Sequence, residues 1–495
     1  MRWREPFARK SVKVCGSALV VVATAMTVVI GFVSCGGSST TMGPQTGSMT
    51  VTLTDPPSCK FPAGSFDHVY VTIRSVQAHT SATADDNSAG WQELAPQLNS
   101  APMQIDLFSA ASNTCLLTQL GSNGALPVGT YQQIRLLLVP NDGSGGATPS
   151  TNACGSNGFN CVVLHDGTVS ELQLSSQANT GIKIPPGQVL GGPITVNAGQ
   201  DVDLNIDFNA CASIVQEGNG AYRLKPVLTA GQVSTNTSGI SGTIVDAGTS
   251  APVVGGTVLV ALERKDATGA DVIFMETTAD SEGKFNFCPL PAGATFDVVT
   301  TAINGAGVAY NATVVLSVPG GTNMGNIPLQ AETGAATGPA TLKGNVAAVS
   351  GGNAGTIDAA VTAQQAVTLS GGGTLMVAIP TLPGSTSNIS VDSTSAGTCS
   401  SIGVSGANCA GYALLVPASN PEVGVFSGGS VTFIPPAGGN VGYTVRADAF
   451  VPGGGGTPSC SPSTQTTNLN ATTAPLVVTG GVTTQVQELD FTGCS

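Results

Sequence analysis

The sequence predicts an all-β fold made of tandem antiparallel β-sandwich domains. Short runs alternate apolar and polar residues, as at Met49, Val51 and Leu53, Gly- and Pro-rich turns separate them, and no long stretch has a helical period. Composition agrees, because the 495 residues include 65 Gly and only 9% are charged. At roughly 150 residues per domain, this length fits about three domains.

The N-terminal segment has the features of an export signal. An apolar run from Val14 to Val33 follows five basic residues, Arg2, Arg4, Arg9, Lys10 and Lys13. The run ends in Ser34-Cys35-Gly36, which resembles the lipobox of bacterial lipoproteins, although Phe32 departs from the usual Leu. The resemblance implies a cleaved lipoprotein signal peptide over 1–34, lipidation of Cys35, a flexible tether over 35–46 and, because Gly36 is not Asp, sorting to the outer membrane.

An uncleaved membrane-spanning helix is the alternative, since about twenty apolar residues can also cross a bilayer. Lipidation is favoured, because the apolar run is joined to a cysteine and then to a Gly/Ser tether. The expected partner is therefore a membrane, contacted through a lipid anchor, and the expected location is the cell envelope.

The charge of the mature chain excludes one class of partner. Removing the five basic residues and Glu5 of the signal leaves 11 basic and 28 acidic residues, a net charge of −17. Such a surface repels nucleic acid and gains nothing from anionic lipid headgroups.

Cysteine usage indicates an oxidising compartment. Without Cys15 and Cys35, an even set of ten cysteines remains, which favours disulfides over metal sites because no Cys-x-x-Cys pair is present. The spacing suggests three pairs: Cys154 with Cys161, Cys399 with Cys409, and Cys460 with Cys494.

Residues 47–234 form the first expected domain. Its motifs are Val51-Thr52-Leu53-Thr54-Asp55-Pro56-Pro57, Ile105-Asp106-Leu107, Leu126-Pro127-Val128-Gly129-Thr130-Tyr131, Ile134-Arg135-Leu136 and Leu224-Lys225-Pro226-Val227. In this order they resemble domain-of-unknown-function family 4382, found in bacterial lipoproteins. The resemblance implies a secreted, anchored β domain with no established reaction.

Residues 238–332 form the second expected domain. The motifs Ile240 to Asp246, Asp280-Ser281-Glu282-Gly283 and Leu290-Pro291-Ala292-Gly293 resemble the carboxypeptidase regulatory-like repeat, a seven-stranded sandwich of the carbohydrate-binding-like class without a peptidase centre. Gly283 supplies the backbone freedom that the turn demands, and Phe285 and Phe287 are expected to point inward. Residues 338–495 are expected to form a Gly/Thr-rich β domain that resembles no family.

The chain offers few candidates for catalysis. Its three histidines are His68, His79 and His165, and no His-Glu-x-x-His, Gly-x-Ser-x-Gly or phosphate-loop motif is present. The neighbours Asp67-His68 and His165-Asp166 point to opposite faces of a strand and cannot form a local relay. We therefore expect no catalytic residues, no cofactor and no enzyme activity.

One acidic stretch is a candidate metal site. Asp201, Asp203, Asn205 and Asp207 share one face of a strand and carry the oxygen ligands that Ca²⁺ prefers. Carboxylates along a straight strand stand roughly 7 Å apart, so a solvated strand face is the favoured interpretation. Trp91 and Tyr131 are either a sugar-stacking platform or core, and core is favoured.

These patterns predict a non-enzymatic lipoprotein of binding or display type. A carbohydrate-binding surface protein is the first alternative, with carbohydrate or another envelope protein as partner. An envelope enzyme with an unrecognised site is the second. Clustering of His68, His165 and the carboxylates of 201–207 around one deep pocket would favour it.

Overall fold

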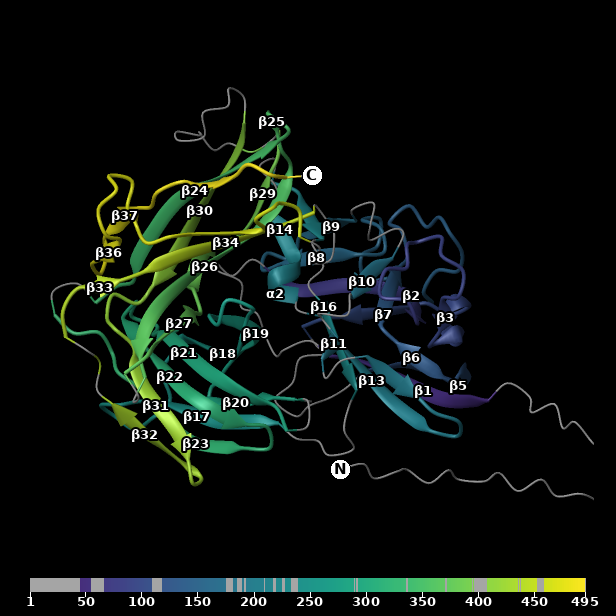
Figure 1. The fold of residues 1–495 in the computed structure, drawn as a ribbon, viewed down its shortest axis with the longest axis horizontal. Helices are drawn as coiled ribbons and strands as arrows, with labels where there is room; N and C mark the ends of the chain where they lie inside the picture. The colour runs from purple at the N-terminus through teal and green to yellow at the C-terminus, as the bar shows by residue number, and fades with distance from the viewer. Residues whose placement is uncertain are drawn as a thin grey trace, which may run out of the picture. The chain divides into compact units, whose positions relative to one another are not determined.

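In the first strand, β1 (Thr46–Thr54), every second residue is buried in the apolar core of the first region. Met49, Val51 and Leu53 are fully buried, while the threonines between them are half-buried. The same period of two recurs in β17 (Ile240–Asp246) and β34 (Thr444–Phe450), and the predicted all-β class is confirmed (Figure 1).

The computed structural model describes residues 45–54, 66–108, 118–174, 181–184, 189–190, 193–208, 210–216, 220–224, 228–232, 239–288, 290, 293–334, 337–369, 372–393, 395, 407–434, 436, 438–451 and 458–494. The predicted signal peptide, Cys35 and residues 35–44 of the tether lie outside this set, as do Cys399 and 225–227. Within it, no helix has the length and apolar character needed to cross a bilayer.

Two main sheets surround the core of the first region. One has the order β11 (Val189–Leu190), β16 (Leu228–Gln232), β13 (Asp201–Phe208), β1 and β5 (Thr118–Pro127). The other has the order β10 (Ile182–Ile184), β7 (Gln133–Leu138), β2 (Phe66–His79), β8 (Cys161–Leu164), β9 (Val169–Leu174), β15 (Tyr222–Leu224) and β14 (Ile214–Gln216), and β3 (Gln92–Glu93) and β4 (Met103–Asp106) also pair with β2.

Short elements complete this region. β12 (Ile194–Val196) pairs with β6 (Gly129–Tyr131), a 3-10 helix η1 covers Pro96–Asn99, and a single helical turn α2 covers Ala210–Ser213. Pairing is mostly antiparallel, as predicted, but β1 lies parallel to β13, β11 to β16 and β15 to β9.

The second region contributes two sheets. One is β20 (Lys284–Phe287), β17 (Ile240–Asp246) and β23 (Asn323–Leu329), where Phe285 and Phe287 are buried as expected. The other has the order β19 (Asp271–Thr278), β18 (Thr257–Lys265), β21 (Thr295–Ile303), β22 (Ala309–Pro319), β31 (Glu422–Ser427) and β32 (Ser430–Ile434). Its last two strands come from the third region, so one sheet joins the two regions.

The remaining strands form the third region. One sheet has the order β25 (Asn353–Ala354), β24 (Ala340–Ser350), β30 (Asn408–Val416) and β28 (Leu382–Thr386), and β37 (Thr483–Gln485) and β38 (Leu489–Phe491) pair with β24. The other has the order β27 (Thr374–Ile379), β26 (Ile357–Thr368), β34 (Thr444–Phe450) and β35 (Thr464–Thr467), with β29 (Asn388–Val391) on β26 and a separate pair of β33 (Val441–Gly442) with β36 (Val477–Val478).

The core of the third region extends onto the second. Buried Val299 of β21 and Val314 of β22 belong to the same apolar cluster as Val361 of β26 and Leu414 of β30. One face of the six-stranded sheet is therefore covered by third-region strands, and its polar residues are removed from water.

Candidate functional site

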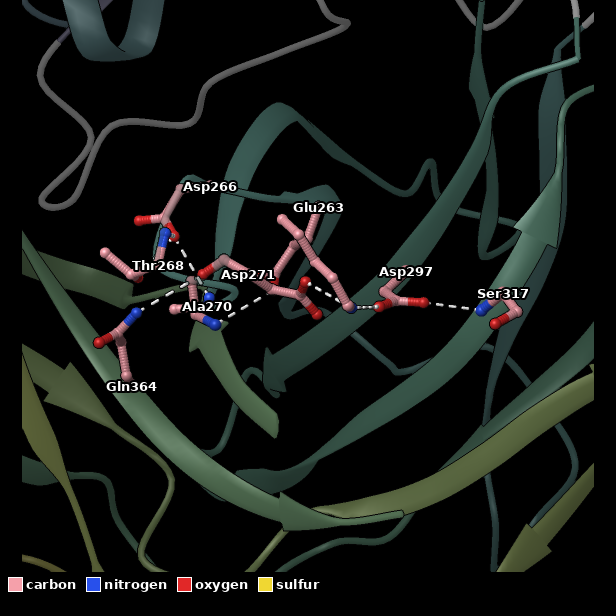
Figure 2. Close-up of polar contacts among 10 residues, drawn as sticks. Glu263, Asp266, Thr268, Ala270, Asp271, Asp297, Ser317 and Gln364 are labelled. Atoms are coloured by element: carbon pink, nitrogen blue, oxygen red, sulfur yellow. Dashed lines mark hydrogen bonds and ion pairs between the residues drawn. The ribbon is translucent and has the colours of Figure 1, made fainter. Parts of the chain in front are cut away.

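Four carboxylic acids share one face of three neighbouring strands, β18, β19 and β21. The register places Asp271 opposite Lys265 and Asp297 opposite Glu263. Alternate residues of a strand point to one side of the sheet, which brings the side chains of Glu263, Asp271 and Asp297 together (Figure 2). We call this group the carboxyl cluster: Glu263, Asp271, Glu276 and Asp297.

Hydrogen bonds fix most of the carboxyl cluster in place. The Ala378 amide of β27 donates to Glu263 Oε2 over 3.1 Å, and the Ser317 amide of β22 donates to Asp297 Oδ1 over 2.7 Å. Lys265 Nζ lies 3.1 Å from Asp271 Oδ1 and 3.3 Å from Asp297 Oδ2. Glu263 Oε1 and Asp271 Oδ2 are buried and receive no hydrogen bond from any described residue.

Burial determines the protonation of the carboxyl cluster. Loss of water raises the pKa of Glu263 well above its usual value, and the nearby charge of Asp271 raises it further. Burial raises the pKa of Glu276 to about 7. The pKa of Asp271 also rises to about 7, through burial first and then through the carboxyl group of Asp297, while Lys265 opposes the shift. Near neutral pH these groups therefore hold protons that exposed carboxylates have lost.

A cavity of about 320 Å³ lies beside the carboxyl cluster. Asp271 and Glu276 line it from β19, and Gln364 and Ala378 line it from β26 and β27. Gln364 Nε2 also approaches the Asp271 carbonyl at 3.5 Å. The volume is within the range of about 300–1,000 Å³ that is typical of small-molecule sites.

Arg446 of β34 lines the same cavity with its charge already paired. Its Nη1 lies 2.5 Å from Asp266 Oδ2, and its Nε lies 2.8 Å from Asp448 Oδ2. The Thr268 hydroxyl also donates to Asp266, over 2.6 Å. Burial alone would raise the pKa of Asp266, but the hydrogen bonds from Thr268 and Arg446 lower it to about 2. Asp266 is therefore ionised and bound to the arginine at neutral pH.

The three histidines lie away from this cavity. His68 Nδ1 lies 2.8 Å from Asp106 Oδ2, and His165, in the turn after β8, pairs with Asp67 of β2. The ring of His79 contacts the Ala89 carbonyl at 2.9 Å. None of these side chains lines the cavity of the carboxyl cluster.

The comparison with known families concerns the first region. Residues 46–226 match the model of a domain of unknown function, DUF4382. The resemblance proposed from the sequence motifs is thereby confirmed for this region. No curated protein matches the chain.

The solved structures that match this chain are only distantly similar to it. The shaft pilin SpaA from Lactobacillus rhamnosus GG is 11% identical, with 59% of this chain and 99% of the pilin covered and a TM-score of 0.17. The minor pilin GBS52 from Streptococcus agalactiae is 10% identical, with 52% and 97% covered and a TM-score of 0.16. A DUF3823 family protein from Bacteroides uniformis is 11% identical, with 44% and 90% covered and a TM-score of 0.14. Scores this low support no argument about function.

Within the DUF4382 domain, the predicted acidic face is only partly solvated. Asp201 and Asp203 are exposed, but Asn205 and Asp207 are buried, so the solvated interpretation is wrong for these two. The cause is tertiary, because β16 pairs with residues 204–208 of β13 but not with residues 201–203.

Hydroxyl groups of β1 face this row. Ser48 donates to Asp201, the Thr52 hydroxyl donates to Asn205 Oδ1 over 3.1 Å, and Asn205 Nδ2 donates to the Thr54 hydroxyl over 2.9 Å. Among the described residues, no group of three His, Cys, Asp or Glu side chains is placed to hold a metal ion.

The two aromatic residues singled out in the DUF4382 domain have different surroundings. Tyr131 is core, 2% exposed, and its hydroxyl donates to the Pro127 carbonyl over 2.8 Å. Trp91 is half-buried, and the Arg135 guanidinium lies 4.2 Å from the centre of its ring. One face of the Trp91 ring is therefore covered by a cation.

Two predicted disulfides are present. Cys154 bonds to Cys161, and Cys460 bonds to Cys494. Cys409 is also disulfide-bonded, but its suggested partner Cys399 lies outside the described residues.

The sequence did not identify the carboxyl cluster or its cavity. One local clue was present: Glu263 interrupts the apolar positions Leu259 and Ala261, which recur every second residue on β18. A charged residue on a strand face that is otherwise apolar is unusual in a chain with so few charges, and it indicates a buried polar contact.

Proposed function

We propose that this protein is a non-enzymatic binding or display protein of the bacterial cell envelope, attached to a membrane through lipid on Cys35. One observation carries the proposal: β31 pairs in parallel with β22, so that the second and third regions share a single sheet. A body whose sheets are joined in this way holds its surface residues in fixed positions, as display or binding requires.

Further contacts support the same function. Arg446 links the third region to Asp266 of the second, and the Ala378 amide links it to Glu263. The disulfide between Cys460 and Cys494 holds the last strands, as suits an oxidising compartment.

The second region, 238–332, is proposed to be a carboxypeptidase regulatory-like domain. Seven strands, β17 to β23, fall within it, which is the number expected for that sandwich. In this proposal the region acts as a structural and binding module, and residues 1–34 are the cleaved export signal of the chain.

The attachment is tested by metabolic labelling with an alkyne-tagged fatty acid, followed by membrane fractionation. The matched variants are Cys35→Ala and Cys15→Ala, because both cysteines belong to the N-terminal segment and only Cys35 has the lipobox context. We expect label in the outer-membrane fraction for the wild type and Cys15→Ala, and no label for Cys35→Ala. Unlabelled wild type, or label that persists without Cys35, overturns the lipid anchor.

A further inference from the structure

The six-stranded sheet shared by the second and third regions ends in an unpaired strand edge. β32 is the last strand of that sheet, and β31 is its only hydrogen-bonded neighbour among the described strands (Figure 1). Ser430, Thr432 and Ile434 are exposed along β32, and Ile434 is 49% exposed although its side chain is apolar. An edge of this kind offers backbone donors and acceptors to the strand of another molecule.

The turn between β31 and β32 determines which backbone groups face outward. Its two residues, Gly428-Gly429, have φ values of +61° and +85°, as a type I′ turn requires. Such a turn makes the flanking Ser427 and Ser430 a hydrogen-bonded pair, after which hydrogen-bonded and non-hydrogen-bonded pairs alternate along the two strands. The N–H and C=O groups of Val431 and Phe433 therefore point away from β31.

β32 lacks the features that protect the other sheet edges. Among the described strands of five or more residues that end a sheet, β5, β23 and β28 contain Gly and Pro, and β19 carries Asp271 and Glu276. β27 is covered by the second region, because its Ala378 amide donates to Glu263. β32 has no charged residue, no Gly or Pro and no register shift against β31. Charges, prolines and bulges normally prevent two sheet edges from pairing.

The charge of the chain favours a second copy as the partner. The hairpin has no charged residue from Val423 to Ile434, whereas the mature chain has 28 acidic and 11 basic residues. A basic partner would find no carboxylate on this edge to bind. Two copies repel each other through most of their surface, but along β32 they can approach without bringing carboxylates together.

Antiparallel pairing of β32 with β32 of a second copy satisfies both edges at once. With Thr432 on the two-fold axis, Val431 of each copy lies opposite Phe433 of the other, so their outward N–H and C=O groups bond reciprocally. Both side chains pack against the core of the second region, and a β-branched residue opposite an aromatic one is a favourable cross-strand pair. Each edge is used once, so the assembly closes as a dimer.

We infer that β32 is a dimerisation edge, through which two copies of this chain join their six-stranded sheets in antiparallel pairing centred on Thr432. The inference goes beyond binding or display by a single copy and does not depend on the lipid anchor. Because β32 has only five residues, the interface is short, and association is expected at micromolar rather than nanomolar concentrations.

Cysteine trapping of the purified full chain in non-ionic detergent tests the register. Thr432→Cys places two cysteines opposite each other in a non-hydrogen-bonded pair, whose Cα atoms stand about 4.5 Å apart, within reach of a disulfide. Ser430→Cys is the matched control, because it is exposed on the same strand face but stands about 14 Å from its counterpart. With copper phenanthroline as oxidant, we expect a covalent dimer for Thr432→Cys. Ser430→Cys should give no more dimer than the wild type.

Analytical ultracentrifugation of the same preparation measures the affinity. Thr432→Asp sets two carboxylates against each other on the axis and is expected to weaken self-association by about tenfold or more. Thr432→Asn has a similar size without the charge and is expected to change it by less than about threefold. Circular dichroism checks that both variants fold. Association through the apolar N-terminal run would respond to neither substitution.

Three results would overturn the inference. They are a wild type that stays monomeric at its highest soluble concentration, equal trapping of Thr432→Cys and Ser430→Cys, and equal affinities of Thr432→Asp and Thr432→Asn. None of them affects the proposal of a lipid anchor, which the labelling of Cys35 tests separately.

Discussion

Arg446 on β34 and Asp266 in the turn after β18 form an ion pair of 2.5 Å, although they lie 180 positions apart in the sequence. Both side chains are largely buried, 12% and 17% exposed. Asp448 and Thr268 complete the arrangement, so the guanidinium and both carboxylates have partners.

Removal of this arginine is expected to be costly. We expect Arg446→Leu to lower the free energy of unfolding by about 3–5 kcal/mol, because it leaves two partly buried carboxylates without their cation. Urea denaturation at pH 7 measures the change. A double-mutant cycle with Asp266→Asn isolates the pair, and a coupling energy near zero would contradict the role assigned to it.

An exposed ion pair provides the control for that measurement. Lys284 and Glu282 are 60% and 69% exposed, so Lys284→Gln is expected to leave the free energy of unfolding nearly unchanged. Equal effects of Lys284→Gln and Arg446→Leu would show that burial of the Arg446 pair is unimportant.

The carboxyl cluster predicts a loss of stability as pH rises. In the unfolded chain Asp271 and Glu276 ionise near their usual pKa values of 3.8 and 4.5, but in the folded protein both pKa values are about 7. Between these values the folded state binds more protons, so the free energy of unfolding falls with rising pH and levels off above about pH 7.

Midpoints of urea denaturation, measured between pH 5 and pH 8, test whether stability falls as pH rises. We expect the midpoint to fall over this window in the wild type, and Glu276→Gln to flatten the fall because its side chain does not ionise. The exposed Glu282→Gln is the matched control and should keep the wild-type slope. A midpoint that rises with pH over this window would contradict the prediction.

The two observed disulfides are expected to differ in their effect on stability. Cys460 and Cys494 are 34 residues apart, whereas Cys154 and Cys161 are 7 apart. The loop-entropy relation then gives about 4 kcal/mol for the longer loop and about 2 kcal/mol for the shorter one.

For each disulfide, a double variant with both cysteines changed to alanine is compared with the wild type by thermal unfolding without reductant. The loss of stability measures the contribution of that disulfide. The larger loss is expected for the double variant at 460 and 494. If the variant at 154 and 161 loses more, native contacts rather than loop length determine the contribution.

Gly283 is expected to resist substitution. Its φ is +77°, and a Cβ atom there would lie 2.3 Å from the Ile244 carbonyl oxygen. We expect Gly283→Ala to lower the free energy of unfolding by about 3 kcal/mol, since the backbone strain is joined by a steric clash.

A second glycine, Gly307, separates the effect of backbone strain from the effect of the steric clash. Its φ is +81°, but no atom of the described residues lies within 4 Å of the position that a Cβ would occupy, so Gly307→Ala is expected to cost only about 1–2 kcal/mol. Chemical denaturation of both variants gives the comparison, and equal losses would rule out the clash at Ile244.

Part of the fold was predictable because its determinants are local. Alternation along 46–54 and 240–246 identifies strands without knowledge of their partners, and Gly283 marks a turn whose φ is positive. The pairing of Cys154 with Cys161 follows from a short loop. The motifs of the DUF4382 domain likewise lie within a single region.

The candidate site was not predictable, because strand pairing over long distances assembles it. A period of two shows which residues share a face, but it does not show what covers that face. The burial of Asn205 and Asp207 was missed for this reason.

By itself, therefore, the sequence determined the all-β class, the DUF4382 domain, the position of the turn at Gly283 and the pairing of the nearby cysteines. Only the tertiary structure decided that β31 joins β22, that β27 covers Glu263 and that the carboxyl cluster lies beside a cavity. The physical reason is that alternation and turn chemistry act between neighbours in the chain, whereas the burial of a carboxyl group depends on segments far away in sequence.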